Sequence, residues 1–176
     1  GIGGGIQNLS KLTITNSTFS GHDSGTGSAI YGRGIGTITL NNSTVSGNTG
    51  DGVVVISSLP TRTFNLNNSI VANNSGADCV RMTGATINAQ NSLIEDGLDC
   101  VNGTNTNNLT GDPALNGDLT LSSASPAINA GDNALAVDAD GNPLTFDLAG
   151  SVRIQQGTVD MGAYESPFTP ALPDVT

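Results

Sequence analysis

A short motif that begins with Asn recurs four times along the chain. Its copies start at Asn16, Asn42, Asn68 and Asn91, so successive copies are 26, 26 and 23 residues apart. A self-similar period of about 20 to 50 residues is typical of solenoids, in which one structural unit is stacked along an axis. The repeat therefore restricts the chain to a fold built from stacked coils.

The four residues before each Asn alternate between apolar and polar side chains. Alternation with a period of two residues indicates a β-strand with one buried face. If the repeats are stacked, their apolar residues form three inward columns, two before the Asn and one after it. These columns are Leu12, Ile38, Phe64 and Ile87; Ile14, Leu40, Leu66 and Ala89; and Phe19, Val45, Val71 and Ile94.

Each recurring Asn is predicted to form a corner between two strands. Asn tolerates the left-handed backbone conformation better than any other non-Gly residue, and stacked Asn amides can hydrogen-bond to one another. The sequence thus predicts an all-β fold, a parallel β-helix, which is right-handed by the general rule for crossover connections. The alternative is turn-rich, low-complexity sequence, which does not explain three apolar columns in register.

The repeat becomes hard to follow from about residue 109. Residues 112–165 hold eight of the fifteen acidic residues, although residues 119–121 still alternate and are expected to add a strand. A bare solenoid end exposes apolar lumen and unpaired strand edges, so terminal segments are usually atypical caps. We expect β-helix coils over residues 1–108, a last coil and irregular acidic C-terminal cap of the same domain over 109–166, and a Pro-rich tail over 167–176.

The charge balance excludes several classes of partner. Five basic residues against fifteen acidic ones give a net charge of −10. We expect no nucleic acid and no anionic membrane as partner, because both require a basic patch. No stretch resembles a transmembrane span, so direct membrane insertion is not expected.

The two cysteines, Cys79 and Cys100, occur in matching contexts, Gly-Ala-Asp-Cys-Val and Gly-Leu-Asp-Cys-Val. They are 21 residues apart, roughly one coil, so stacking brings them side by side. We predict a disulfide, which indicates an extracellular or periplasmic setting. Two buried free thiols are the alternative, and a metal site would need further ligands.

Five stretches carry a family resemblance. They are residues 68–71, 76–79, 111–113, 125–132 and 160–165, the last two reading Ser-Pro-Ala-Ile-Asn-Ala-Gly-Asp and Asp-Met-Gly-Ala-Tyr-Glu. The repeats resemble Pmp-like or pectate-lyase-like coils of secreted bacterial β-helix proteins, and the part from Asn68 onward resembles the choice-of-anchor Q domain at their carboxyl end. The resemblance implies a secreted or cell-surface module and transfers no catalytic residue.

An enzyme acting on polysaccharides is the main rival interpretation. Such enzymes need paired carboxylates, or calcium beside a basic residue, on the outer face of adjacent coils. A flat Thr-rich face is also found on ice-binding solenoids, so ice binding is a further alternative. The twelve predicted outward positions of the first sheet contain no carboxylate. These positions are Lys11, Thr37, Thr63, Thr86, Thr13, Thr39, Asn65, Asn88, Thr15, Asn41, Asn67 and Gln90. We therefore assign no catalytic residue.

One acidic loop suggests calcium. Asp138, Asp140 and Asn142 alternate as oxygen ligands, with Asp147 nearby in the sequence. The loop is not an EF-hand, because Pro143 occupies the position that requires Gly and no Glu closes it. Asp140 and Gly141 also form a standard tight-turn pair, so a plain turn and a calcium-stiffened loop both remain open.

These observations favour a non-enzymatic structural module, secreted or at the cell surface, that acts as an adhesin, a spacer or a building block of a matrix or filament. The chain begins inside a repeat, so we expect that its first coil can receive the end of a neighbouring chain, giving head-to-tail filaments. Binding to other cell-surface components is a further expectation. The alternative is a polysaccharide-binding or lyase-like β-helix, although its few aromatic residues offer little platform for sugar rings.

Overall fold

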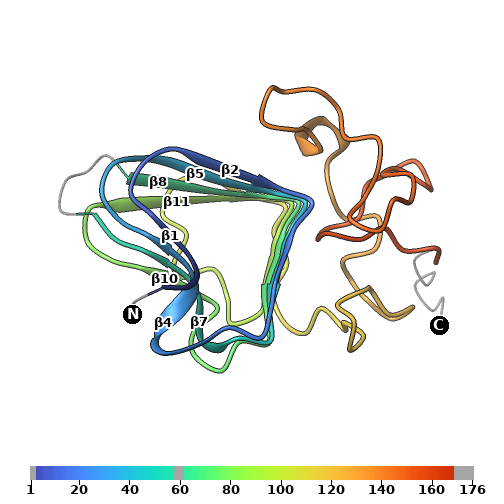
Figure 1. Cartoon of the computed structure of the whole chain (residues 1–176). Helices are drawn as coiled ribbons and strands as arrows, with labels where there is room; N and C mark the ends of the chain where they lie inside the picture. The colour runs from blue at the N-terminus through green and yellow to red at the C-terminus, as the bar shows by residue number, and fades with distance from the viewer. Residues whose placement is uncertain (1–2, 58–61, 169–176) are drawn as a thin grey trace.

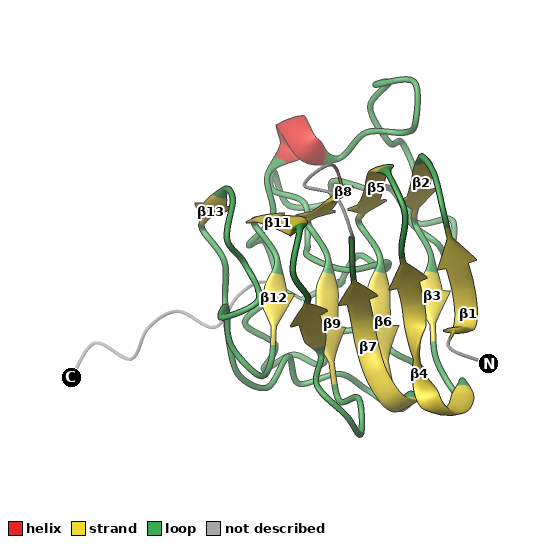
Figure 2. Ribbon diagram, turned by 90° about the vertical axis from the view of Figure 1, so that its left-hand side faces the viewer, coloured by secondary structure: helices red, strands yellow, loops and turns green. Residues whose placement is uncertain are grey.

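The computed structural model describes residues 3–57 and 62–168. Within these residues, three parallel sheets form about three turns of a β-solenoid, which confirms the predicted fold class (Figures 1 and 2). The chain visits sheets A, B and C in the same order on each turn. The predicted Pro-rich tail lies outside the described residues from 169 onward.

Each sheet contains one strand from each of the four coils that carry the Asn motif, and sheet B contains a fifth strand, β13. Sheet A consists of β1 (Gly3–Asn8), β4 (Asp23–Gly32), β7 (Thr49–Val55) and β10 (Cys79–Arg81). Sheet B consists of β2 (Leu12–Thr15), β5 (Gly36–Asn41), β8 (Arg62–Asn67), β11 (Ala85–Gln90) and β13 (Asn105–Thr106). Sheet C consists of β3 (Thr18–Phe19), β6 (Thr44–Ser46), β9 (Ile70–Ala72) and β12 (Leu93–Ile94).

The three predicted apolar columns are present in the predicted register. Leu12 pairs with Ile38, Ile38 with Phe64, and Phe64 with Ile87. The columns headed by Ile14 and Phe19 are paired in the same way. Their members form one continuous core, and most are fully buried. Burial of this apolar surface is the main favourable contribution to folding.

The four corner Asn residues adopt left-handed backbone with φ between 44° and 47°. Their amides do not hydrogen-bond to one another as expected. A column of Ser residues one position later connects the coils instead, because the backbone N–H groups of Ser17, Ser43 and Ser69 each donate to the Ser hydroxyl of the next coil. The corner amides are therefore available for other partners.

The end of the solenoid after β11 is covered by residues 97–108, which we call the end segment. Leu98 and Val101 pack against the core, and the Asn102 amide bonds Ile87 N and Ala85 O at the edge of β11. The predicted disulfide is confirmed, because Cys100 in this segment is bonded to Cys79 in β10. It ties the end segment to the last strand of sheet A.

The irregular acidic segment does not cover the solenoid end. Residues 112–168, which we call the lateral segment, run along the side of the coils, next to sheet C and the corner between sheets B and C (Figure 1). Residues 119–121 add no strand to the stack, since Leu121 forms only an antiparallel bridge with Leu115. The expectation of a cap failed here because the end segment already covers the lumen.

The lateral segment contacts one coil after another on its way back toward the first. The donors are the amides of Asn91, Asn68, Asn41 and Asn16, and the acceptors are the backbone carbonyls of Ala130, Asp132, Val137 and Phe146 in that order. The partners are up to 130 residues apart in sequence. The amides of three corner Asn residues, together with that of Asn41 next to the remaining corner, thus fasten the lateral segment to all four coils.

A second core lies between sheet C and the lateral segment. The outward residues Ile70, Ala72 and Leu93 pack against apolar residues of the lateral segment. These partners are Leu121, Ala127, Ile128 and Met161. Sheet C is therefore buried on both faces in its last two coils, as parallel sheets usually are.

Three hairpin-like loops of one design make up much of the lateral segment. Their antiparallel bridges join Leu115 to Leu121, Val137 to Pro143 and Phe146 to Val152. In each loop, the residue after the first bridge residue donates its N–H to the carbonyl four positions later. Its own carbonyl accepts a hydrogen bond from the N–H three positions later. These residues are Asn116, Asp138 and Asp147. The turn position has positive φ and is occupied by Leu119, Gly141 and Gly150 respectively. Gly adopts this conformation without steric cost, so two of the loops carry the expected residue.

We predict that Asn68→Ala destabilises the protein by about 2 kcal/mol more than Asn42→Ala, as measured by urea unfolding. Both residues are fully buried and have similar φ, but only the Asn68 amide has partners, Asp132 O and Asp132 N. Losing two buried hydrogen bonds leaves their partners unsatisfied. Equal losses in the two variants would contradict a fastening role for the corner amides.

Candidate functional site

The outer face of sheet B is polar and uncharged beyond its first strand. In β8 and β11 the residues alternate between buried and partly exposed positions, as the sequence predicted. The outward amides hydrogen-bond between coils, Asn88 to Asn65 and Asn67 to Asn41. These side chains are committed to holding the coils together. None of the twelve outward positions supplies a carboxylate for acid–base chemistry.

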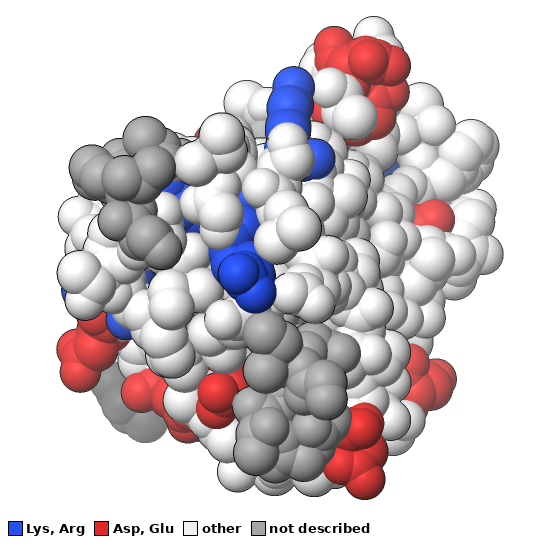
Figure 3. Space-filling view, turned by 60° about the vertical axis from the view of Figure 1, so that its left-hand side comes forward, with Lys and Arg blue, Asp and Glu red and all other residues white. Residues whose placement is uncertain are grey.

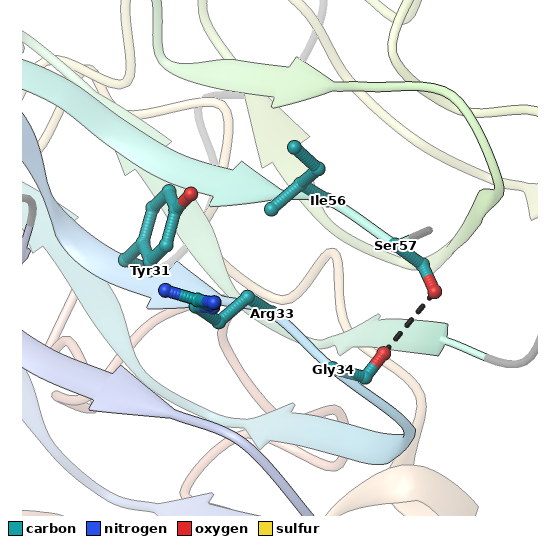
Figure 4. Close-up of a pocket in the computed structure, with 5 residues that line it drawn as sticks. All are labelled: Tyr31, Arg33, Gly34, Ile56 and Ser57. Carbon is teal, nitrogen blue, oxygen red and sulfur yellow. Dashed lines mark hydrogen bonds between the residues drawn. The ribbon is translucent and has the colours of Figure 1, made fainter. Parts of the chain in front are cut away.

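A pocket of about 350 Å³ lies on the outside of the corner between sheets A and B (Figure 4). Tyr31 projects from β4, and Arg33 follows two residues later. Gly34, Ile56 and Ser57 complete the lining, and the Ser57 hydroxyl donates to Gly34 O. The pocket offers one aromatic ring and one cation, but no carboxylate. Among the described residues, its lining contains no pair of carboxylates of the kind that glycoside hydrolysis uses.

The same corner carries exposed apolar side chains. Leu9, Ile35 and Met82 are 58%, 57% and 43% exposed. Lys11 and Arg33 are also exposed, and neither has an acidic partner within the described residues. Figure 3 shows basic side chains near the centre of this face and acidic ones toward its margins. The corner is thus both apolar and basic on an otherwise acidic protein.

The four predicted calcium ligands lie in two successive hairpin-like loops, residues 137–143 and 146–152. The Asp138 carboxylate accepts hydrogen bonds from Asp140 N, Asn142 N and the Asn142 amide, and the Asn142 amide is the main cause of its lowered pKa. Asp147 is buried and accepts from its own loop and from Glu165 N. Across residues 3–57 and 62–168, no three acidic, His or Cys side chains cluster as metal ligands. The hydrogen bonds favour the plain turn, and calcium binding stays a prediction.

A buried cluster of charges in the lateral segment was not foreseen from the sequence. Arg153 is fully buried and its Nε lies 3.2 Å from Glu165 Oε1, although without good hydrogen-bond geometry. Its other nitrogens donate to the carbonyls of Asp160, Gly162 and Ala163. Nη1 also donates to Asn16 Oδ1 in the first coil. Arg153 therefore organises residues 160–165 and joins them to the solenoid.

Arg62 is a second buried cation and was also missed. It occupies an inward position at the start of β8 and is 1% exposed. Its guanidinium donates to carbonyls of earlier coils, Asn8 O, Ser10 O and Ile35 O. Burial lowers the pKa of Arg62. Both Arg residues serve the architecture, and neither lines a pocket described here.

Comparison with known proteins gives no further assignment. No protein-family model, no curated protein and no solved structure matches this chain. Among the helices of the described residues, none has the length and hydrophobicity to span a membrane.

We predict that the free energy of unfolding falls as the pH rises from about 5 to 8. Burial raises the pKa of Glu165 from 4.5 to about 8, although the charge of Arg153 acts in the opposite direction. Between these pH values the folded protein holds a proton that the unfolded chain has released. Stability is therefore highest below the unfolded pKa and is lost toward the folded pKa, by at most about 1.4 kcal/mol per pH unit.

Urea unfolding at several pH values tests this dependence. Glu165→Gln should flatten most of the slope, with a residual contribution from Asp160, whose pKa is also raised by burial. Asp99→Asn is the control, because Asp99 is exposed and far from the buried cluster in sequence. A slope that is unchanged in Glu165→Gln would contradict the prediction.

Proposed function

We propose that this chain is a non-enzymatic structural module of a secreted or cell-surface β-helix protein, serving as a spacer, an adhesin or a building block of a matrix. The observation that carries this proposal is the lateral segment, which is hydrogen-bonded to each of the four coils. Such cross-linking resists bending and separation of neighbouring coils. Stiffness of this kind is what a spacer or scaffold requires.

The polar groups of the molecule support the same conclusion. The two buried Arg residues and the amides on sheet B have structural partners, and neither of the two pockets in the described residues is lined by a carboxylate pair. Enzymes need titratable groups free to face a substrate. The disulfide supports a setting outside the reducing cytosol.

The resemblance to choice-of-anchor Q proteins adds weight to a cell-surface location. Two of the five stretches that carry it, residues 125–132 and 160–165, contribute hydrogen bonds that hold the lateral segment to the coils. Gly162 N donates to Asn68 O, and Ala163 N donates to the Thr44 hydroxyl. The quoted motifs thus have a structural reason that requires no catalysis.

A polysaccharide-binding role is the second candidate, favoured by Tyr31 and Arg33 in one pocket. Within the described residues the pocket has one ring and one cation, and the net charge of −10 opposes acidic polymers.

We expect no unsaturated or reducing products when the protein is incubated with pectate, alginate and related polysaccharides, with and without calcium. Retention on an acidic polysaccharide that is lost in Tyr31→Ala and kept in Tyr164→Ala would support the binding role instead. Product formation above a heat-denatured control would overturn the non-enzymatic proposal.

A further inference from the structure

The exposed large apolar side chains gather in two places. Three of the eight in the described residues lie at the corner between sheets A and B, and four lie between residues 146 and 154. We call the first group, Leu9, Ile35 and Met82 with the adjoining Tyr31, Arg33 and Ile56, the corner face. We call the second group, Phe146, Leu148, Val152 and Ile154, the hairpin patch. Contiguous exposed apolar surface usually marks an interaction site.

The corner face is regular along the solenoid axis. Four of its residues directly follow strand residues that are paired in register within sheet A. They are Leu9, Arg33, Ile56 and Met82. They therefore repeat with the coil spacing of about 4.8 Å. These four residues therefore form one row along the solenoid axis.

The hairpin patch is held in a fixed shape by buried polar residues beneath it. Asp147 accepts hydrogen bonds from Ala149 N and Ser151 N, and Arg153 is buried directly after Val152. Val152 and Ile154, with Ser151 and Gln155, line a hollow of about 400 Å³. The hairpin patch can therefore bind a partner surface with little loss of conformational entropy, because its residues are already ordered.

The two surfaces are complementary in charge and lie on opposite sides of the molecule (Figure 1). The corner face includes the exposed Arg33 and lies beside the exposed Lys11, and neither cation has an acidic partner in the described residues. The lateral segment that carries the hairpin patch has five acidic residues that are not buried, whereas its one basic residue, Arg153, is buried. These acidic residues are Asp112, Asp118, Asp132, Asp138 and Asp140. Opposite potentials steer the two surfaces together and disfavour like-to-like contacts.

We propose that copies of this chain associate side by side, with the hairpin patch of one copy on the corner face of the next. The proposal rests on the structural role proposed above and names its partner as a second copy of the chain. Because the two surfaces differ, the contact is heterologous and each copy keeps one surface free. Contacts of this kind can be repeated from one copy to the next, which gives rows of parallel solenoids. The polar residues 102–107 of the end segment make end-to-end stacking less favourable.

Sedimentation velocity of the full 176-residue chain, at concentrations up to about 0.5 mM and at low and high salt, tests the proposal. The average mass should rise with concentration and fall with added salt. Ile35→Lys and Val152→Lys, at positions 57% and 58% exposed, should each weaken self-association at least about tenfold. An equal mixture of these two variants should form dimers and nothing larger, because each retains the surface that the other lacks.

Thr110→Lys is the matched control, since it adds the same charge at an exposed position outside both surfaces. Met82→Lys replaces Ile35→Lys if that variant does not fold. A monomeric wild type at the highest concentration, self-association that survives both substitutions, or a mixture without dimers would overturn the proposal. A protein that stays monomeric and is retained on an acidic polysaccharide through the corner face would also overturn the proposal. Enzymatic products would overturn the structural role alone and leave the sedimentation result standing.

Discussion

Hydrogen bonding between neighbouring coils is the constraint on which the rest of the structure depends. Parallel strands in register require each coil to repeat the backbone path of the coil before it. The corners must therefore coincide, which explains why Asn recurs where φ lies between 44° and 47°. An L-residue in this region normally costs about 1 kcal/mol or more, and Asn lowers that cost. The Ser that follows each Asn then supplies a hydrogen bond from one coil to the next.

Much of this architecture was predictable because the repeat states each structural position four times. A single apolar residue such as Phe64 says little about its surroundings, but aligned copies identify an inward column. The same reasoning joined Cys79 to Cys100, since residues about one coil apart become neighbours. Periodicity therefore gave the register of the sheets, the corners and the disulfide. It gave no information on the part of the chain where the period ends.

The position of the lateral segment depends on contacts that no local pattern records. Asn16 meets Phe146 across 130 residues, and buried Arg153 meets backbone carbonyls that any sequence could provide. One signal was available. The column Thr18, Thr44, Ile70 and Leu93 changes from polar to apolar on the outward side of sheet C. That change marks the coils against which the second apolar core packs, and it could have replaced the expectation of an end cap.

The two covering segments decide which surfaces remain for recognition. The end segment covers one end of the lumen, and the lateral segment covers sheet C with the adjoining corner. Burial removes two of the five basic residues, Arg62 and Arg153, from the surface, together with the acidic residues Asp78, Asp147, Asp160 and Glu165. The corner between sheets A and B then stands out because it keeps its cations and its apolar residues exposed. We therefore propose this corner, among the described residues, as the surface that holds a partner.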